Sequence, residues 1–141
     1  GAIKNIIAIG AGISDGLSLG DNSKAGLITR GIEETSRIIL ASGGKKQTAF
    51  GLAGIGDMTL TCSSPHSRNM KYGMDLVLKK TNLETELIEG VHSLKAAKNL
   101  SKKLNLETPI INAINDIILK NKDIEKVILE LFKRPIKSEF N

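Results

Sequence analysis

Aromatic residues are nearly absent from this chain of 141 residues, which has no Trp, one Tyr and three Phe. Hydrophobic residues nevertheless make up 40% of the sequence and charged residues 25%, a composition typical of a globular domain. A chain of this length corresponds to about one domain and buries roughly two-thirds of its unfolded surface. The core must therefore be built from Ile, Leu, Val and Ala.

Cysteine and long apolar runs are also scarce. The single cysteine, Cys62, cannot form an internal disulfide, which fits a reducing compartment, so we expect a cytoplasmic protein. The apolar stretch near the amino end is interrupted by Gly10 and Gly12, unlike a signal peptide. No stretch approaches ~18 consecutive apolar residues, so we expect no membrane span.

Metal-binding and thiol-catalysis patterns are missing as well. The two histidines, His66 and His92, lie far apart and have no other metal-type ligands at a suitable spacing, so we expect no metal site. Cys62 and His66 have no evident third residue to orient them. A packing role for the cysteine is therefore favoured over a nucleophilic one.

The charge of the chain is moderately positive. A formal net charge of +5 allows three kinds of partner: nucleic acid, an acidic membrane surface or a small anion. The lysines are dispersed, and no run of five or more like charges forms a basic tail. Aromatic and basic residues do not alternate, as a stacking surface for single strands would require. We therefore expect no nucleic-acid partner.

Apolar periodicity predicts an all-α domain of six or seven helices. Residues 2–19 are apolar and small, and periodicity leaves open a buried helix or, at Ile6 to Ile9, a short strand. The next helix is expected to start at a cap, Asp21 or Asn22, and to run to about Ala41, where Gly43 and Gly44 end it. Its candidate inward residues are Ala25, Ile28, Ile32, Ile38 and Ile39.

Further helices are predicted in the second half of the chain. Residues 67–80 are predicted to form a helix with Ser67 as a cap. Residues 91–104 are predicted to form an amphipathic helix, in which the apolar residues in helical register are Val91, Leu94, Ala97 and Leu100. Thr108 is placed to cap the following helix, with Pro109 at its first position. A last helix is expected over residues 123–132.

A glycine-rich stretch near the amino end imitates a dinucleotide-binding loop. Gly10, Gly12 and Gly16 follow the apolar run 6–9 in a spacing close to that of the Rossmann fingerprint. That motif needs a helix directly behind the loop and a second strand ending in an acidic residue about 20 residues on. Gly20 interrupts the helix that should follow the loop, and no βαβ pattern provides the second strand with its acidic residue. We therefore predict close helix packing by small residues.

Polar side chains concentrate in the segment 57–69, behind glycine-rich residues 51–57. Arg68 lies close to a predicted helix start, where the guanidinium and the helix dipole would act together on an anion. By chemistry alone, a polar loop with helix caps explains the segment equally well. Similarly, Lys4 beside Asn5 in an apolar stretch is, taken alone, best explained as a surface lysine whose stem packs on the protein.

The order of short motifs resembles the second domain of bacterial-type NAD(P)-dependent glycerol-3-phosphate dehydrogenases. The matching stretches cover almost the whole chain: 1–9, 12–17, 19–25, 27–31, 51–57, 60–62, 67–69, 89–91, 109–110 and 134–135. The resemblance implies an all-α domain like the C-terminal domain of 6-phosphogluconate dehydrogenases. Residues 1–141 would form the C-terminal substrate-binding domain, and an N-terminal Rossmann domain that binds NAD or NADP would lie outside this chain.

The implied reaction is the reversible NAD(P)H-dependent reduction of dihydroxyacetone phosphate to glycerol 3-phosphate, for phospholipid synthesis. The isolated domain is expected to be inactive because half of the site lies in the Rossmann domain. That domain and the two triose phosphates are the expected partners, and a homodimer is a candidate assembly.

The resemblance also assigns site residues. Lys4 matches the family's catalytic lysine, which also contacts substrate. Further substrate contacts match Asn5, Asp57, Thr61, Ser67, Arg68 and Asn69. Cofactor contacts match Arg68, Leu87 and Glu89. His92 stands where the family commonly has Arg.

Two alternatives remain open at this stage. A basic helical module that binds nucleic acid or protein would explain the charge and the helices, but not the polar segment 57–69. Half of a β-hydroxyacid dehydrogenase would share the architecture, but not the Ser-Arg-Asn sequence at 67–69.

Overall fold

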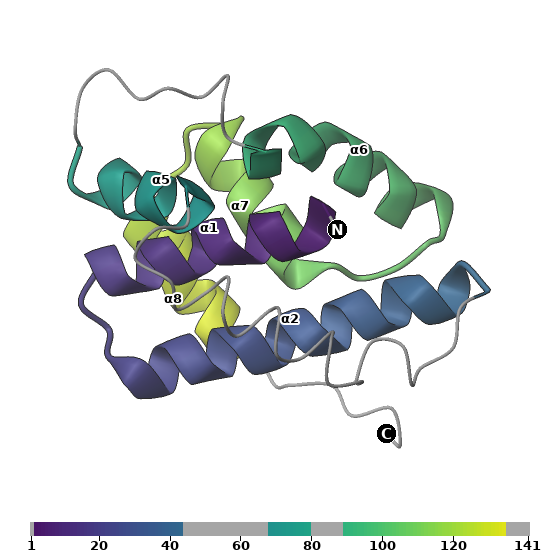
Figure 1. The fold of residues 1–141 in the computed structure, drawn as a ribbon, viewed down its shortest axis with the longest axis horizontal. Coiled ribbons are helices and arrows are strands. Elements are labelled where there is room, and N and C mark those ends of the chain that lie inside the picture. The colour runs from purple at the N-terminus through teal and green to yellow at the C-terminus, as the bar shows by residue number, and fades with distance from the viewer. Residues whose placement is uncertain (1, 44–67, 80–88, 135–141) are drawn as a thin grey trace.

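The computed structural model describes residues 2–43, 68–79 and 89–134, and within these ranges it contains six helices and no strand (Figure 1). The all-α prediction is confirmed. The helices are α1 (Ala2–Gly16), α2 (Asp21–Ala41), α5 (Arg68–Val77), α6 (Glu89–Lys103), α7 (Pro109–Ile118) and α8 (Ile124–Lys133). None of these six helices combines the length and the hydropathy that a membrane-spanning segment requires.

Helix α1 is the centre of the fold, in contact with α2, α5, α6 and α7 (Figure 1). Ile6, Ile7 and Ile9 are each at most 1% exposed. With Ala8, which is also fully buried, they form four successive helical positions that point in different directions. The middle of α1 is therefore apolar on every side, as expected for a helix surrounded by others. The strand alternative for residues 6–9 is therefore wrong.

Glycines bring α1 and α5 into backbone contact. A Cβ atom on Gly12 would overlap the carbonyl oxygen of Met70, and a Cβ atom on Gly73 would overlap the carbonyl oxygen of Ile9. Residues 10–16 lie inside α1, so they cannot form a nucleotide-binding loop, and the prediction of close packing is confirmed. The start of α5 is thereby held against α1.

Helix α2 begins differently from the prediction. Its N-cap is Gly20, at φ 93°, and no side chain caps its first turn. The predicted caps Asp21 and Asn22 were wrong because the left-handed glycine turns the chain directly into the helix, and Asp21 becomes its first residue. An acidic residue there still favours the positive end of the helix dipole. The predicted end is confirmed: the helix stops at Ala41, and Gly43 has φ 87°.

The buried face of α2 is rotated from the predicted one. Ala25 is exposed, whereas Leu27, Gly31, Glu34 and Ile38 are buried. These four residues follow one helical stripe at spacings of three and four. Of the predicted inward residues, Ile38 is confirmed as buried, and Ile28, Ile32 and Ile39 are partly buried. Periodicity of apolar residues missed the rest of the stripe because two of its members are a glycine and a glutamate.

The later helices agree more closely with the sequence. In α6, Leu94 and Ala97 are buried as predicted, while Leu100 is 37% exposed and Ser101 is buried in its place. In α7, Pro109 is the first helical residue, as expected. The side chain of Asp123 caps α8 by accepting a hydrogen bond from the amide of Lys126 at 3.0 Å.

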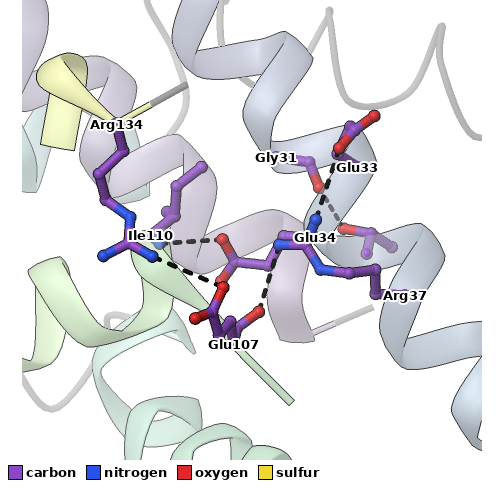
Figure 2. Close-up of polar contacts among 8 residues, drawn as sticks. Gly31, Glu33, Glu34, Arg37, Glu107, Ile110 and Arg134 are labelled. Atoms are coloured by element: carbon purple, nitrogen blue, oxygen red, sulfur yellow. Dashed lines mark hydrogen bonds and ion pairs between the residues drawn. The ribbon is translucent and has the colours of Figure 1, made fainter. Parts of the chain in front are cut away.

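The cap of α7 comes from another helix. Thr108 is the N-cap residue, but its side chain makes no capping hydrogen bond. Instead, Glu34 of α2 accepts a hydrogen bond from the amide of Ile110 at 2.9 Å (Figure 2). It accepts a second one from the amide of Ile111 at 3.0 Å. The prediction of Thr108 as a side-chain cap is wrong because a buried carboxylate already satisfies these amides.

Candidate functional site

The first turns of α1, α5 and α6 meet at one place. A Cβ atom built on Gly90, the second residue of α6, would lie 2.9 Å from the carbonyl oxygen of Asn5 in α1 and 2.9 Å from Oδ1 of Asn69 in α5. The absence of a side chain at Gly90 allows the three helix starts to approach this closely. Two pairs of predicted site residues, Lys4–Asn5 and Arg68–Asn69, therefore lie next to the same glycine.

Asn69 is the most buried of these four residues, with 7% of its surface exposed. Its Oδ1 accepts a hydrogen bond from the backbone amide of Gly90 at 2.9 Å. The first amides of a helix have no partner within the helix, so Asn69 supplies the acceptor that α6 lacks. This role had no local signal in the sequence, because the two residues are on different helices.

Lys4, Asn5 and Arg68 are more accessible. The side chains of Lys4 and Asn5 are partly buried near the start of α1, and Arg68 is exposed at the first position of α5. Both Lys4 and Asn5 make polar or electrostatic interactions in the folded chain. Asn5 and Asn69 therefore lie at the junction itself, and Lys4 and Arg68 precede them directly in α1 and α5.

The electrostatics of this junction favour an anion. The N-terminal ends of α5 and α6 each carry the partial positive charge of a helix dipole, and backbone amides are the natural donors to a phosphate there. Lys4 and Arg68, the neighbours in sequence of Asn5 and Asn69, carry two formal positive charges, and Glu89 at the first position of α6 carries one negative charge. A guanidinium binds phosphate oxygens in a forked geometry, whereas a lysine can also transfer a proton.

Other predicted site residues lie outside the described ranges: Asp57, Thr61, Ser67 and Leu87. Glu89 is the first residue of α6, and only its backbone position is described. Cys62 and His66 also fall outside, while His92 is exposed on α6. Among the residues that the structure does describe, no three His, Cys, Asp or Glu side chains are grouped so that they could hold a metal ion.

A separate open groove of about 410 Å³ lies between α7 and α8. Its lining includes Thr108, Asn112, Asp116, Glu130 and Arg134. None of the four described site residues lines it. Three acidic residues, Glu107 among them, give it the opposite electrostatic character to the helix junction.

Sequence reasoning missed one buried acidic residue, Glu34, which is 1% exposed. Burial raises the pKa of Glu34 to about 7, although the amides of Ile111 and Ile110 and the charges of Arg37 and Arg134 act to lower it. Figure 2 shows the surrounding contacts: Arg37 donates to the carbonyl oxygen of Glu107 at 3.2 Å, and Arg134 pairs with the Glu107 carboxylate at 3.6 Å. This cluster joins α2, α7 and the end of α8, and it is not part of the helix junction.

The sequence is similar to known proteins along almost its whole length. Residues 1–129 match the family described as NAD-dependent glycerol-3-phosphate dehydrogenase C-terminus. Across 99% of its length, the chain is 44% identical to glycerol-3-phosphate dehydrogenase [NAD(P)+] of Fusobacterium nucleatum. It is 46% identical to the protein of that name in Listeria monocytogenes serotype 4a, also across 99% of the chain.

A solved structure matches the fold. The crystal structure of glycerol-3-phosphate dehydrogenase from Coxiella burnetii superposes with a TM-score of 0.89 over 95% of this chain, at 39% sequence identity. The chain spans 43% of the length of that protein and 43% of the length of the two bacterial relatives.

Proposed function

Because the chain belongs to the family of NAD-dependent glycerol-3-phosphate dehydrogenase C-terminal domains, we propose that it is the substrate-binding half of an enzyme that reversibly reduces dihydroxyacetone phosphate to glycerol 3-phosphate. The observation that carries this proposal is the meeting of the Lys4–Asn5 and Arg68–Asn69 pairs at the junction of three helix starts. The positive charges of Lys4 and Arg68, which adjoin the junction in sequence, suit a dianionic substrate.

The proposed chemistry assigns the proton to Lys4. In reduction, its ammonium group donates a proton to the C2 ketone oxygen, and in oxidation the neutral amine accepts the proton of the C2 hydroxyl. Its positive charge also stabilises the oxygen while negative charge develops there, an effect worth roughly 3–4 kcal/mol for an aimed donor. Asn5 and Asp57 orient Lys4 and the substrate hydroxyls.

The phosphate group is assigned to the start of α5. Arg68, with Ser67 and Asn69, would bind its oxygens, and Thr61 would add a further contact. A guanidinium at the positive end of a helix combines directional hydrogen bonds with favourable charge. The exposure of Arg68 at the first position of α5 supports this role, because the substrate can reach it.

When bound, NADH or NADPH would supply the hydride for reduction, and NAD+ or NADP+ would accept it in oxidation. The described residues fit the cofactor's phosphates, because Arg68 and the starts of α5 and α6 offer positive charge and backbone donors. Arg68, Leu87 and Glu89 would contact the cofactor from this side. We place the main cofactor site in an N-terminal Rossmann domain, and the greater length of the bacterial relatives supports this division.

Two further assignments follow from the same proposal. The single Cys62, which cannot form an internal disulfide, supports a cytoplasmic location. The product, glycerol 3-phosphate, would enter phospholipid synthesis. The chain alone would be inactive, because the nucleotide half of the site is needed for turnover. We also propose a homodimer, which light scattering would test.

The direct test uses the full-length enzyme and follows NAD(P)H absorbance. Dihydroxyacetone phosphate should cause oxidation of the cofactor, and the unphosphorylated ketone dihydroxyacetone should do so far more slowly. Oxidation of a β-hydroxyacid, without activity on dihydroxyacetone phosphate, would instead indicate a β-hydroxyacid dehydrogenase. Salt-dependent DNA binding without any turnover would replace it with the nucleic-acid module.

A further inference from the structure

We propose that Asn69 is a positioning residue for the cofactor side of the site, in addition to its proposed substrate contact. Its side chain fixes the start of α6, and through Gly90 it sets where Glu89 lies. This inference rests on the function proposed above, since it concerns how that site is held together.

The hydrogen bond between Asn69 and Gly90 determines the orientation of the amide. An asparagine side chain has one carbonyl oxygen, which accepts, and one NH2 group, which can only donate. Oδ1 is 2.9 Å from the Gly90 amide nitrogen in a buried contact. Because Oδ1 is occupied by the Gly90 amide, the side-chain NH2 group is the part of Asn69 that can bind a phosphate. One side chain thus serves both the helix start and the anion.

On its other side, Gly90 lies close against α1. A Cβ atom on Gly90 would lie 2.6 Å from Cδ1 of Ile9 and 2.9 Å from the carbonyl oxygen of Asn5. The tip of Ile9 can rotate away, but the Asn5 carbonyl belongs to the backbone of a buried helix. Any side chain at position 90 would therefore push the start of α6 away from α1.

The start of α6 is consequently fixed between two site elements. Lys4 precedes the Asn5 carbonyl on one side, Asn69 lies on the other, and Glu89 is bonded directly to Gly90. Loss of either contact would move Glu89 relative to Lys4. The expected consequence is weaker cofactor binding from a substitution at a residue that was assigned only to the substrate.

The test compares Asn69→Asp with Asn69→Ala in the full-length enzyme. Aspartate keeps an oxygen for the Gly90 amide but replaces the donor with a carboxylate, so KM for dihydroxyacetone phosphate should rise while KM for NAD(P)H stays close to the wild-type value. Alanine removes both functions, so both KM values should rise, that for NAD(P)H by about fivefold or more, as expected for loss of one buried hydrogen bond. Gly90→Ala should raise KM for NAD(P)H in the same way while keeping Asn69.

Hydrogen exchange at the Gly90 amide gives a readout that does not depend on activity. Asn69→Asp should preserve the protection of this amide, and Asn69→Ala should speed its exchange by about fivefold or more. If Asn69→Ala does not fold, the Asn69→Asp result alone decides: loss of Gly90 protection or of cofactor affinity in that variant overturns the proposal.

The two proposals can fail separately. A wild-type enzyme that does not oxidise NAD(P)H with dihydroxyacetone phosphate refutes the proposed function, while the exchange rates still test the bond between Asn69 and Gly90. An active enzyme in which Asn69→Ala raises only the KM for dihydroxyacetone phosphate, with unchanged Gly90 exchange, refutes the positioning role.

Discussion

The carboxylate of Glu34, in the middle of α2, accepts a hydrogen bond from the backbone amide of Ile110 at 2.9 Å and thereby caps α7. A second bond, from the amide of Ile111 at 3.0 Å, uses the other carboxylate oxygen. A buried carboxylate at the positive end of a helix is favoured by the dipole and opposed by desolvation. In Glu34 desolvation has the larger effect on the pKa, which burial raises to about 7.

This balance predicts a particular pH dependence of stability. The pKa of Glu34 is about 7 in the folded chain and has an ordinary value of 4.5 in the unfolded one. The stability contribution of the protonated group is therefore fully present below about pH 4.5 and is lost as pH rises through about 7. At about 1.4 kcal/mol per pH unit, the loss amounts to about 3 kcal/mol.

Glu34→Gln tests this prediction, because glutamine does not titrate. The free energy of unfolding would be measured by chemical denaturation of both proteins from pH 4.5 to 8. The difference, wild type minus variant, should fall as pH rises, and the titration of all other groups cancels. A difference that is constant or that rises with pH would mean that the helix dipole, Arg37 and Arg134 outweigh burial.

Gly12→Ala and Gly26→Ala form a matched pair on the close approach of α1 and α5. A methyl group on Gly12 would overlap the carbonyl oxygen of Met70, whereas a methyl group on Gly26 meets nothing within 4 Å. We expect Gly12→Ala to destabilise the fold by about 2 kcal/mol or more. Gly26→Ala should stabilise α2 by ~0.5–1 kcal/mol, because alanine is the better helix former. Thermal unfolding measures both, and equal effects would contradict the packing described for Gly12.

Thr108→Val and Asp123→Ala distinguish an unused cap from a working one. Oγ1 of Thr108 is buried and has no hydrogen-bond partner among the described residues, so its replacement by the isosteric valine should be neutral or stabilising by about 1 kcal/mol. The Asp123 side chain caps α8 through the Lys126 amide, and its loss should cost about 1 kcal/mol. Denaturant titration of the two variants provides the comparison. A clear destabilisation by Thr108→Val would show that Thr108 takes part in capping α7.

Arg68→Ala tests the assignment of the substrate phosphate. If the guanidinium binds that phosphate, KM for dihydroxyacetone phosphate in the full-length enzyme should rise by about 10-fold or more, because a charge-assisted hydrogen bond contributes ~1.5–3 kcal/mol. Lys71→Ala is a suitable control, since Lys71 is another exposed basic residue of α5. An unchanged KM for the Arg68 variant would remove this residue from the substrate site.

The sequence predicted the helices well because their apolar periodicity is local information. Residues 6–9 were ambiguous since a helix that is apolar on every side has no stripe, and only the contacts of α1 with four other helices decide its form. The caps of α6 and α7 could not be predicted, because Asn69 and Glu34 lie on other helices than the amides that they bind. Gly20 displaced the predicted cap of α2 through a left-handed φ that composition does not reveal.

The candidate site was also predictable only in part. The ordered motifs indicated Lys4, Asn5, Arg68 and Asn69 as site residues, but only the structure brings the two pairs together. Their meeting depends on three glycines, at positions 12, 73 and 90, which let helices approach to backbone contact. Small residues at these positions are compatible with many arrangements, so the junction of α1, α5 and α6 could not be derived from spacing alone.

The proposed role of Lys4 as the proton donor and acceptor is tested by the turnover of Lys4→Ala in the full-length enzyme. The measurement is kcat for NAD(P)H oxidation with saturating dihydroxyacetone phosphate, with Lys95→Ala, an exposed lysine of α6, as the control. We expect kcat of the Lys4 variant to fall by about 10²- to 10⁴-fold, with cofactor binding and folding preserved and the Lys95 variant unaffected. Turnover of Lys4→Ala close to that of the wild type would contradict this role of Lys4.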